Sequence, residues 1–335
     1  MSSQPSPQVN PEHIFFTLNA FQQSYALKGA LELELFTHIA DGAKTPAEIA
    51  ARCQANERGV RVLCDYLTII GFLTKSSGGY ALTPESATFL NKHSPAYMGT
   101  ISHFILNDWQ VANFRDMAGV VRKGSTLAGD MDPENPVWVD FARNMVPIVY
   151  PVTQAVAAVA GEPGKKIKVL DIAAGHGMFG IAIALRNPAA EIVAVDWKNV
   201  LEVALENAAR AGVQSRYRTL PGSAFDVDFG TGYDLGLLPN FLHHFDYPTN
   251  VALIKKIRAA LNPGARVITA EFVPNDDRVT PPAAAAFSLM MLGATNGGDA
   301  YTFRELDQMF RDAGFSSTTL HDIPSSPEKL LVTEY

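Results

Sequence analysis

The chain has 335 residues, which is long for one ordinary domain and sufficient for two. Hydrophobic residues make up 47% and charged residues 18%, the balance of a globular protein. The formal net charge of -7 disfavours nucleic acid as the main partner, because a phosphate backbone is bound by basic surfaces.

The number of cysteines and the lack of long apolar runs in the sequence indicate the cellular compartment of the protein. The two cysteines, Cys53 and Cys64, are too few for a disulfide framework and indicate a reducing compartment. We expect no metal, because no group of cysteines and histidines has ligand spacing. The first eleven residues lack the features of a signal peptide, and no apolar run reaches the roughly 18 residues of a membrane span. We therefore expect a cytoplasmic protein.

The N-terminal third is predicted to be mainly helical. Apolar residues at helical spacing predict a helix over about 12–40. Thr45-Pro46-Ala47-Glu48 has the order of a helix start, with an N-cap, a proline and an acid at the third position. A further helix is predicted over 57–70. Two short strands, 72–74 and 80–82, are joined by a serine- and glycine-rich turn, which predicts a hairpin.

Helices followed by a hairpin are typical of a winged-helix domain, and the pattern then changes. Residues 84–160 are predicted to be mainly helical, with a break rich in proline and glycine at 124–136. Gly161-Glu162-Pro163-Gly164 is the clearest boundary. We expect an arm at 1–11, a winged-helix domain at 12–100, a helical connector at 101–160 and an α/β domain at 161–335.

Short apolar runs alternate with helical segments after this boundary, which predicts a mostly parallel sheet flanked by helices. The predicted strands cover 167–172, 192–195, 234–238 and 266–272. An antiparallel hairpin of 317–321 and 329–333 is predicted to close one edge.

The segment from Val169 to Gly180 carries the most functional information. A buried strand enters a glycine-rich turn and then a helix, so the backbone can approach a ligand closely. Asp196 closes the next strand, where its carboxylate can accept both ribose hydroxyls of an adenosine. The glycines also match the dinucleotide fingerprint, so a nicotinamide cofactor and S-adenosylmethionine (SAM) both fit. For SAM, Asp171 offers an acceptor to the loop and to the amino group.

At these residues the chain resembles the class I SAM-dependent methyltransferases. Over nearly its whole length it is similar to the small-molecule O-methyltransferases, which include plant caffeate-type and bacterial antibiotic and pigment enzymes. That resemblance implies a Rossmann-like α/β domain with a mostly parallel seven-stranded sheet, preceded by a mainly α-helical winged-helix dimerisation domain. The segments that follow the family in order are 31–36, 45–50, 63–72, 80–83, 261–264, 297–298 and 313–315.

The resemblance also implies a set of SAM contacts. Gly175 and Gly177 match the SAM loop of the family, although Ala173 and Ala174 stand where it has glycines. Ser223 stands where the family often has an acid. The implied contacts are Asp171, Ala173, Gly175, Gly177, Asp196, Trp197, Ser223, Ala224, Phe225 and Asn240.

His243 matches the catalytic histidine of the family, and Glu271 matches an acid that braces it. An oxygen nucleophile attacks a sulfonium methyl far better when deprotonated, and a general base of this kind contributes about 10²–10⁴-fold. Holding the two reactants in line contributes about 7–11 kcal/mol and is the larger effect. The family often has a second acid where Ala300 stands here, with Asp299 displaced by one residue.

Other candidate residues have two readings each. His244 is read either as a neighbour of the base and cofactor or as a structural residue, and His176 either lines the SAM pocket or faces solvent. Aromatic and methionine residues at helical spacing are also common in plain cores. The residues that match acceptor-lining regions of the family are Trp109, Phe141, Met145, Phe287, Met290, Met291 and Asn296.

These residues together predict transfer of a methyl group from SAM to a hydroxyl of a small aromatic or apolar metabolite. Three alternatives remain open: a C- or N-methyltransferase of the same fold, an NAD(P)-dependent oxidoreductase, and a non-catalytic SAM-sensing or DNA-binding regulator. Arg58 and Arg61 are too few for a convincing DNA-reading helix. We expect a homodimer through the N-terminal domain, where Phe15, Phe16 and Phe21 lie close together, and neither nucleic acid nor membrane as a partner.

Overall fold

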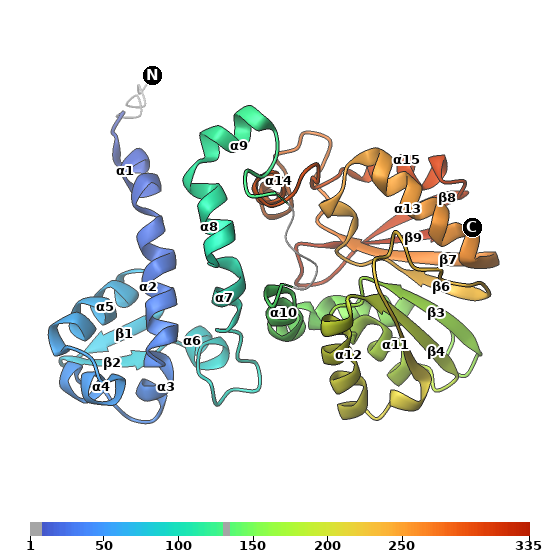
Figure 1. Cartoon of the computed structure of the whole chain (residues 1–335). Coiled ribbons are helices and arrows are strands. Elements are labelled where there is room, and N and C mark those ends of the chain that lie inside the picture. The colour runs from blue at the N-terminus through green and yellow to red at the C-terminus, as the bar shows by residue number, and fades with distance from the viewer. Residues whose placement is uncertain (1–8, 130–134) are drawn as a thin grey trace, which may run out of the picture. The chain divides into compact units, whose positions relative to one another are not determined.

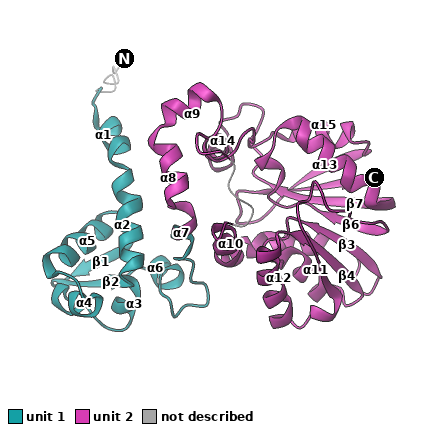
Figure 2. Ribbon diagram, in the orientation of Figure 1, with its two compact units in different colours: residues 1–102 teal, residues 103–335 magenta. Residues whose placement is uncertain are grey.

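The computed structural model describes residues 9–129 and 135–335. Most of the predicted arm at 1–11 and part of the predicted break at 124–136 therefore lie outside the described residues. The chain forms two compact units, residues 1–102 and 103–335, shown in teal and magenta in Figure 2. The helical segment before the predicted boundary at 161–164 thus belongs to the second unit, together with the sheet.

The first unit has the predicted order of helices followed by a hairpin (Figure 1). The fourth helix begins with a capping box, in which Glu48 N donates to Thr45 Oγ1 and Thr45 N donates to Glu48 Oε2. The elements are α1 (Glu12–Asn19), α2 (Phe21–Glu32), α3 (Leu35–Ala40), α4 (Pro46–Cys53), α5 (Glu57–Ile69), β1 (Leu73–Ser76), β2 (Gly79–Leu82) and α6 (Pro84–Phe89).

The prediction of one helix over 12–40 is wrong. Glu34 has a φ of 52°, in the left-handed region, and this break lets α3 turn so that Leu35 and Phe36 enter the core of the unit. No residue of α1 is buried, and Phe16 is 72% exposed. Helix α1 therefore presents an apolar surface that its own unit does not cover.

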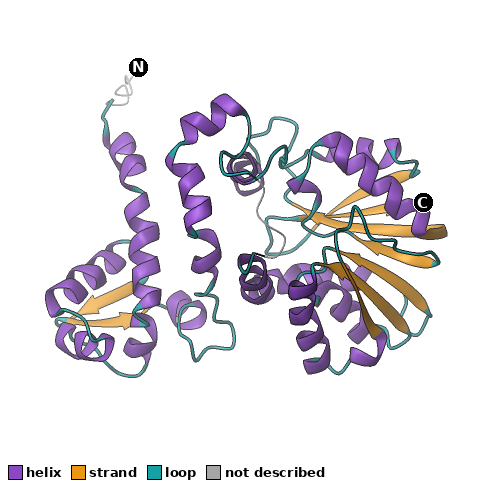
Figure 3. Ribbon diagram, in the orientation of Figure 1, coloured by secondary structure: helices purple, strands orange, loops and turns teal. Residues whose placement is uncertain are grey.

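The second unit is built on a seven-stranded sheet of order β5-β4-β3-β6-β7-β9-β8 (Figure 3). The first five strands pair in parallel, and β9 and β8 add an antiparallel edge, which confirms the predicted fold class. The strands are β3 (Ile167–Ile172), β4 (Ala190–Asp196), β5 (Tyr217–Pro221), β6 (Tyr233–Leu237), β7 (Leu261–Glu271), β8 (Ser317–Asp322) and β9 (Lys329–Glu334).

Helices cover both faces of this sheet. One face packs against α10, α11 and α12, and the other against α13 and α15. The helices and short turns are α7 (Ile101–Ile105), α8 (Asp108–Arg115), α9 (Met117–Lys123), α10 (Val137–Val159), α11 (Met178–Arg186), α12 (Lys198–Arg210), η1 (Gln214–Arg216), η2 (Leu242–His244), α13 (Tyr247–Ala260), α14 (Pro282–Ala294) and α15 (Phe303–Asp312).

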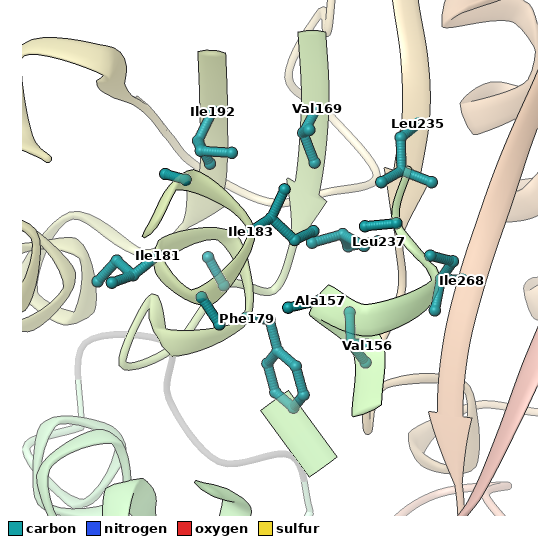
Figure 4. Packing of buried hydrophobic residues seen from close by; sticks show 14 of the residues in the cluster. Val156, Ala157, Val169, Phe179, Ile181, Ile183, Ile192, Leu235, Leu237 and Ile268 are labelled. Carbon is teal, nitrogen blue, oxygen red and sulfur yellow. The ribbon is translucent and has the colours of Figure 1, made fainter. Parts of the chain in front are cut away.

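Alternation along the strands divides the core into two layers. Within β3, Val169 packs toward α10 and α11, whereas Leu170 packs toward α13 and α15. Figure 4 shows the first layer, in which Val156 and Ala157 of α10 meet Ile183 of α11 and the strand residues Val169 and Leu237. A sheet buried on both faces is a rigid support, so the loops at the carboxyl ends of its strands are held in fixed places.

Residues 9–129 and 135–335 contain neither a candidate membrane span nor a candidate metal site. None of the helices there is both long and apolar enough to cross a membrane. The same residues hold no cluster of three or more histidine, cysteine, aspartate or glutamate side chains suited to a metal ion.

Candidate active site

His243 and Glu271 form a buried pair at the carboxyl edge of the sheet. His243 lies in η2, just after β6, and Glu271 is the last residue of the neighbouring β7. His243 Nδ1 lies 2.6 Å from Glu271 Oε2, and the two residues are 6% and 2% exposed. Glu271 Oε1 accepts two further hydrogen bonds, from Phe241 N at 3.1 Å and Leu242 N at 2.9 Å.

This arrangement fixes the tautomer of the histidine. A carboxylate only accepts hydrogen bonds, so Nδ1 of His243 carries the proton that it donates to Glu271. In the neutral ring Nε2 is then unprotonated and has a free lone pair. The pair can therefore take up one proton at Nε2 while Glu271 stabilises the resulting positive ring.

Aromatic side chains surround the histidine. The ring of Phe287, from α14, meets His243 edge-on with centroids 4.9 Å apart, and Phe272 stacks on Phe287 at 4.1 Å. The ring of His244 lies 4.4 Å from that of His243. Burial, followed by the neighbouring His243, lowers the pKa of His244 well below its usual range, so His244 is neutral. It therefore does not compete as a base.

The glycine loop between β3 and α11 lies at the same edge of the sheet. Gly177 has a φ of 75° and caps α11, and a Cβ there would lie 2.6 Å from Tyr217 Oη and 2.9 Å from Ala204 Cβ. Only glycine fits this position. Gly175 has a φ of 57°, and only a backbone oxygen 3.9 Å away lies near its missing Cβ, so this side of the loop is open.

Asp196, the last residue of β4, supports that loop. Its Oδ2 accepts from Gly175 N at 2.8 Å and its Oδ1 accepts from Trp197 N at 2.7 Å. Burial raises the pKa of Asp196 to about 6, so it is mostly ionised at neutral pH. Each carboxylate oxygen can accept more than one hydrogen bond, which leaves capacity for two ribose hydroxyls.

Asp171 lies in β3, two residues before the loop begins at Ala173. It is fully buried, and its Oδ2 accepts from Gly180 N at 3.1 Å. Burial raises the pKa of Asp171 to about 8, so the group is mostly protonated at neutral pH. The hydrogen bond from Gly180 N holds Asp171 against the first turn of α11, and its Oδ1 is buried without a hydrogen-bond partner among the described residues, so its predicted contact with SAM stays a prediction. The substituted Ala173 has a φ of 52°, a left-handed conformation that favours glycine.

The segment after β5 forms an aromatic corner beside Asp196. Gly222 N donates to Asp196 O at 2.9 Å, which joins the ends of β4 and β5. Ser223 Oγ accepts from Phe225 N at 3.1 Å, and Lys256 Nζ donates to the carbonyl oxygens of Ala224 and Phe225. The Phe225 ring lies 4.9 Å from Phe245 and 6.5 Å from Phe241. This corner offers flat apolar faces to a purine ring.

Two predicted residues near the loop have clear roles within the protein. His176 is buried, and its Nδ1 accepts from Met178 N at 3.1 Å. Burial lowers the pKa of His176 to about 4, which keeps it neutral, and the reading that exposes it to solvent is wrong. Trp197 packs against a small buried cluster of Ala142, Val200 and Val203, as do Trp138 and Val139 of α10.

The residues predicted to line the binding site of the methyl-accepting substrate come from several elements, and those outside α10 are described first. Phe287 contacts His243, and Met290 accepts from Gln110 Nε2, next to Trp109 in α8. Met291 is buried. Asn296 lies in the turn after α14, where a Cβ on Gly298 would lie 2.0 Å from His243 O, so this turn is pressed against η2.

The remaining two predicted acceptor residues lie on α10. Phe141 pairs with Phe104 at 4.6 Å, and Met145 packs against the sheet core. Their contact with a substrate stays a prediction.

Two polar residues, Asn240 and Glu328, lie beside the His243–Glu271 pair, and only Asn240 was predicted from the sequence. Asn240, predicted as a cofactor contact, has a φ of 52°, and its backbone N–H donates to Ala270 O at 2.8 Å. Its side-chain Nδ2 donates to Glu328 Oε2 at 3.3 Å, and its Oδ1 is buried without a hydrogen-bond partner among the described residues. Sequence reasoning missed Glu328, because a single acid in a loop carries no motif. Phe272 was also missed, although it follows a predicted catalytic acid directly.

The polar and aromatic groups at this edge of the sheet fit SAM. An ionised carboxylate with spare acceptor capacity ends β4, an open glycine loop precedes it, and an aromatic corner follows. The unpartnered Oδ1 of Asn240 adds a buried acceptor at the same edge. These groups match ribose hydroxyls, an amino acid part and an adenine.

Comparison with known families supports the same reading. A model of the O-methyltransferase dimerisation domain matches residues 16–92, and a model of the O-methyltransferase domain matches residues 153–316. A protein of Nostoc punctiforme PCC 73102, itself assigned to the O-methyltransferases, has a solved structure with a TM-score of 0.93. It is 50% identical to this chain, and the alignment covers 99% of this chain and 100% of that one.

Two functionally described bacterial proteins are also similar. The SAM-dependent methyltransferase PigF of Serratia sp. strain ATCC 39006 is 26% identical, over 94% of this chain and 93% of its own length. A structure of PigF with S-adenosylhomocysteine (SAH) has a TM-score of 0.87, at 25% identity and with coverage of 98% and 100%. The 3-hydroxy-5-methyl-1-naphthoate 3-O-methyltransferase of Streptomyces sahachiroi is 26% identical, over 94% of this chain and 92% of its own length.

Proposed function

Because this chain belongs to the SAM-dependent O-methyltransferase family, we propose that it methylates a hydroxyl of a small aromatic molecule with His243 as the general base. The methyltransferase activity, the SAM cofactor and the family were all predicted from the sequence and are confirmed. The oxidoreductase and regulator alternatives find no support among the relatives. The observation that carries the proposal is the 2.6 Å contact between His243 Nδ1 and Glu271 Oε2.

SAM, when bound, supplies a methyl group on a positively charged sulfur that an oxygen nucleophile attacks in line. Asp196 and the loop around Gly175 would hold the ribose and amino acid parts of SAM, and Phe225 would pack against its adenine. His243 Nε2 takes the proton from the acceptor hydroxyl, and Glu271 stabilises the protonated ring. Phe287 and Phe272 exclude water from the base, which strengthens the interaction between the ring and the carboxylate.

An aromatic acceptor is supported by the side chains around the base. Phe287, stacked on Phe272, provides a flat apolar surface beside His243, whereas contacts of Trp109 and Met290 with the substrate stay predictions. The Streptomyces sahachiroi relative acts on a hydroxynaphthoate, a phenol of the size that such surfaces suit. The L-tyrosine C(3)-methyltransferase of Streptomyces lavendulae, 26% identical, keeps carbon as a second candidate acceptor atom.

We further propose that the protein works as a homodimer in the cytoplasm. The exposed apolar surface of α1 and the match to a dimerisation domain support the dimer. The two cysteines, both free, support a reducing compartment.

The test combines binding with an acceptor screen. Isothermal titration with SAM and SAH should give one site per chain, whereas no heat and no thermal shift would refute the cofactor assignment. The protein and SAM are then incubated with hydroxynaphthoates and simpler phenols, and products are identified by mass spectrometry and NMR. Methyl ether formation supports the proposal. Methylation of these compounds at a ring carbon would replace oxygen with carbon as the acceptor atom. If only arylamines added to the same screen are methylated, nitrogen would be the acceptor atom.

A further inference from the structure

A second buried glutamate, Glu328, lies beside the His243–Glu271 pair although it comes from a distant part of the chain. It is the last residue of the connection between β8 and β9, and it is 6% exposed. In the antiparallel pairing of β9 with β7, Lys329 stands opposite Glu271. The chain therefore delivers Glu328 to the end of β7 at which the catalytic acid is placed.

Hydrogen bonds fix Glu328 in this position. Asn240 Nδ2 donates to Glu328 Oε2 at 3.3 Å, and Asn240 N donates to Ala270 O at 2.8 Å. Asn240 thus connects Glu328 to the turn that leads into His243. On the other side, Glu328 N donates to Ser326 Oγ at 3.2 Å, which orders the preceding loop. Glu328 is part of the same polar assembly as the base.

The charges around Glu328 come from several elements. Glu271 of β7 and His243 of η2 both act on its carboxyl group, and His244 beside His243 is neutral. Lys329 is paired with Asp322, so this neighbouring cation is engaged elsewhere. Burial and then the charge of Glu271 raise the pKa of Glu328 to about 7, while Asn240 and His243 oppose the rise. A buried acid without an ion-pair partner is costly, and such groups concentrate at functional sites.

We propose that Glu328 is a positioning residue for the base, coupled to the His243–Glu271 pair so that its carboxylate stabilises His243 when the ring is protonated. When the ring is neutral, Glu328 holds a proton. When His243 takes a proton, Glu328 releases its own to solvent, so the buried assembly changes its total charge little. The inference rests on the proposed role of His243, but its test needs no acceptor.

The test follows the protonation of His243 directly. The full chain is labelled with ¹⁵N in its histidine rings, saturated with SAH, and titrated by NMR; the His243 signals are those lost in His243→Asn. In Glu328→Gln, which keeps an acceptor for Asn240, the midpoint of the His243 titration should fall by about half to one pH unit. The matched control is Glu334→Gln, an exposed glutamate at the other end of β9, which should leave the curve unchanged.

The wild-type curve is itself a test. Coupled groups titrate together, so the His243 curve of the wild-type protein should be broader than a single-site curve and should become single-site in Glu328→Gln. Glu328→Asp, which keeps the charge, should retain the broad curve. Identical midpoints in wild type and Glu328→Gln, or a single-site wild-type curve, would overturn the proposal. If SAH does not bind, the cofactor assignment fails, but the same titration without SAH still decides the role of Glu328.

Discussion

Replacing Glu271 with glutamine should leave the fold intact and disable His243 by reversing its tautomer. In the wild-type protein Glu271 accepts three hydrogen bonds, two at Oε1 from Phe241 N and Leu242 N and one at Oε2 from His243 Nδ1. Glutamine has one oxygen and one amide nitrogen, so it can satisfy only one of these two sides as an acceptor.

The two backbone groups decide which way the glutamine side chain turns. If its nitrogen faced Phe241 N and Leu242 N, two buried donors would lose their acceptor, at about 1–3 kcal/mol each. The oxygen therefore stays with the backbone, and the amide nitrogen faces His243. Because that nitrogen only donates, Nδ1 of His243 must become an acceptor, and the ring proton moves to Nε2. A ring protonated at Nε2 has no lone pair to offer the acceptor hydroxyl.

Loss of the base should remove the contribution of general base catalysis, about 10²–10⁴-fold in kcat. The hydrogen-bond count is nearly kept, so we expect SAH affinity within about threefold of wild type and a Tm within a few degrees. Steady-state kinetics on an acceptor found in the screen measures the first quantity, and calorimetry measures the others. Glu334→Gln serves as the control. A Glu271→Gln enzyme with near wild-type kcat would refute the orienting role of Glu271.

Four further outcomes are expected. His243→Ala should bind SAH like wild type and lose most turnover, and unchanged turnover would remove it as the base. SAH affinity should fall as the pH drops below about 6, because protonation of Asp196 removes a ribose acceptor, and Asp196→Asn should bind weakly without this pH dependence in calorimetry. Ala173→Gly should raise the free energy of unfolding in urea by about 0.5–1 kcal/mol, because glycine tolerates the left-handed φ of 52°; a lower value would contradict this account. Phe16→Asp should convert a dimer to a monomer in light scattering, whereas a persistent dimer would place the interface elsewhere.

Local sequence patterns were sufficient for the elements that form the cofactor side of the site. The apolar runs at 167–172 and 192–195 are strands because both faces of the sheet are covered. The glycines after the first run and Asp196 after the second are then brought to one edge by parallel pairing. Strand β5, Tyr217–Pro221, was not predicted, since this edge strand lacks a continuous apolar run.

Contacts that depend on distant chain segments could not be predicted. The break at Glu34 serves the burial of α3, and neither glycine nor proline marks it. Glu328 follows a loop with no periodic pattern, and its approach to Glu271 depends on the register between β7 and β9. A one-residue slip in that register would turn the side chain away, and no local propensity fixes it.

The four carboxyl groups at this edge of the sheet explain how a protonated histidine can form there. If all four were ionised in a buried space, their repulsion would destabilise the fold. The pKa of Asp171 is raised to about 8, so this group is mostly protonated near neutral pH. The pKa of Glu328 is raised to about 7, so this group is protonated in part of the molecules. Asp196, whose pKa is about 6, is mostly ionised near neutral pH, and the side chains of Asp196 and Glu271 are each fixed by two backbone N–H donors. The cationic sulfur of SAM and the transiently protonated ring of His243 therefore both lie near negative charge. Glu328 adds further negative charge only when the ring is protonated.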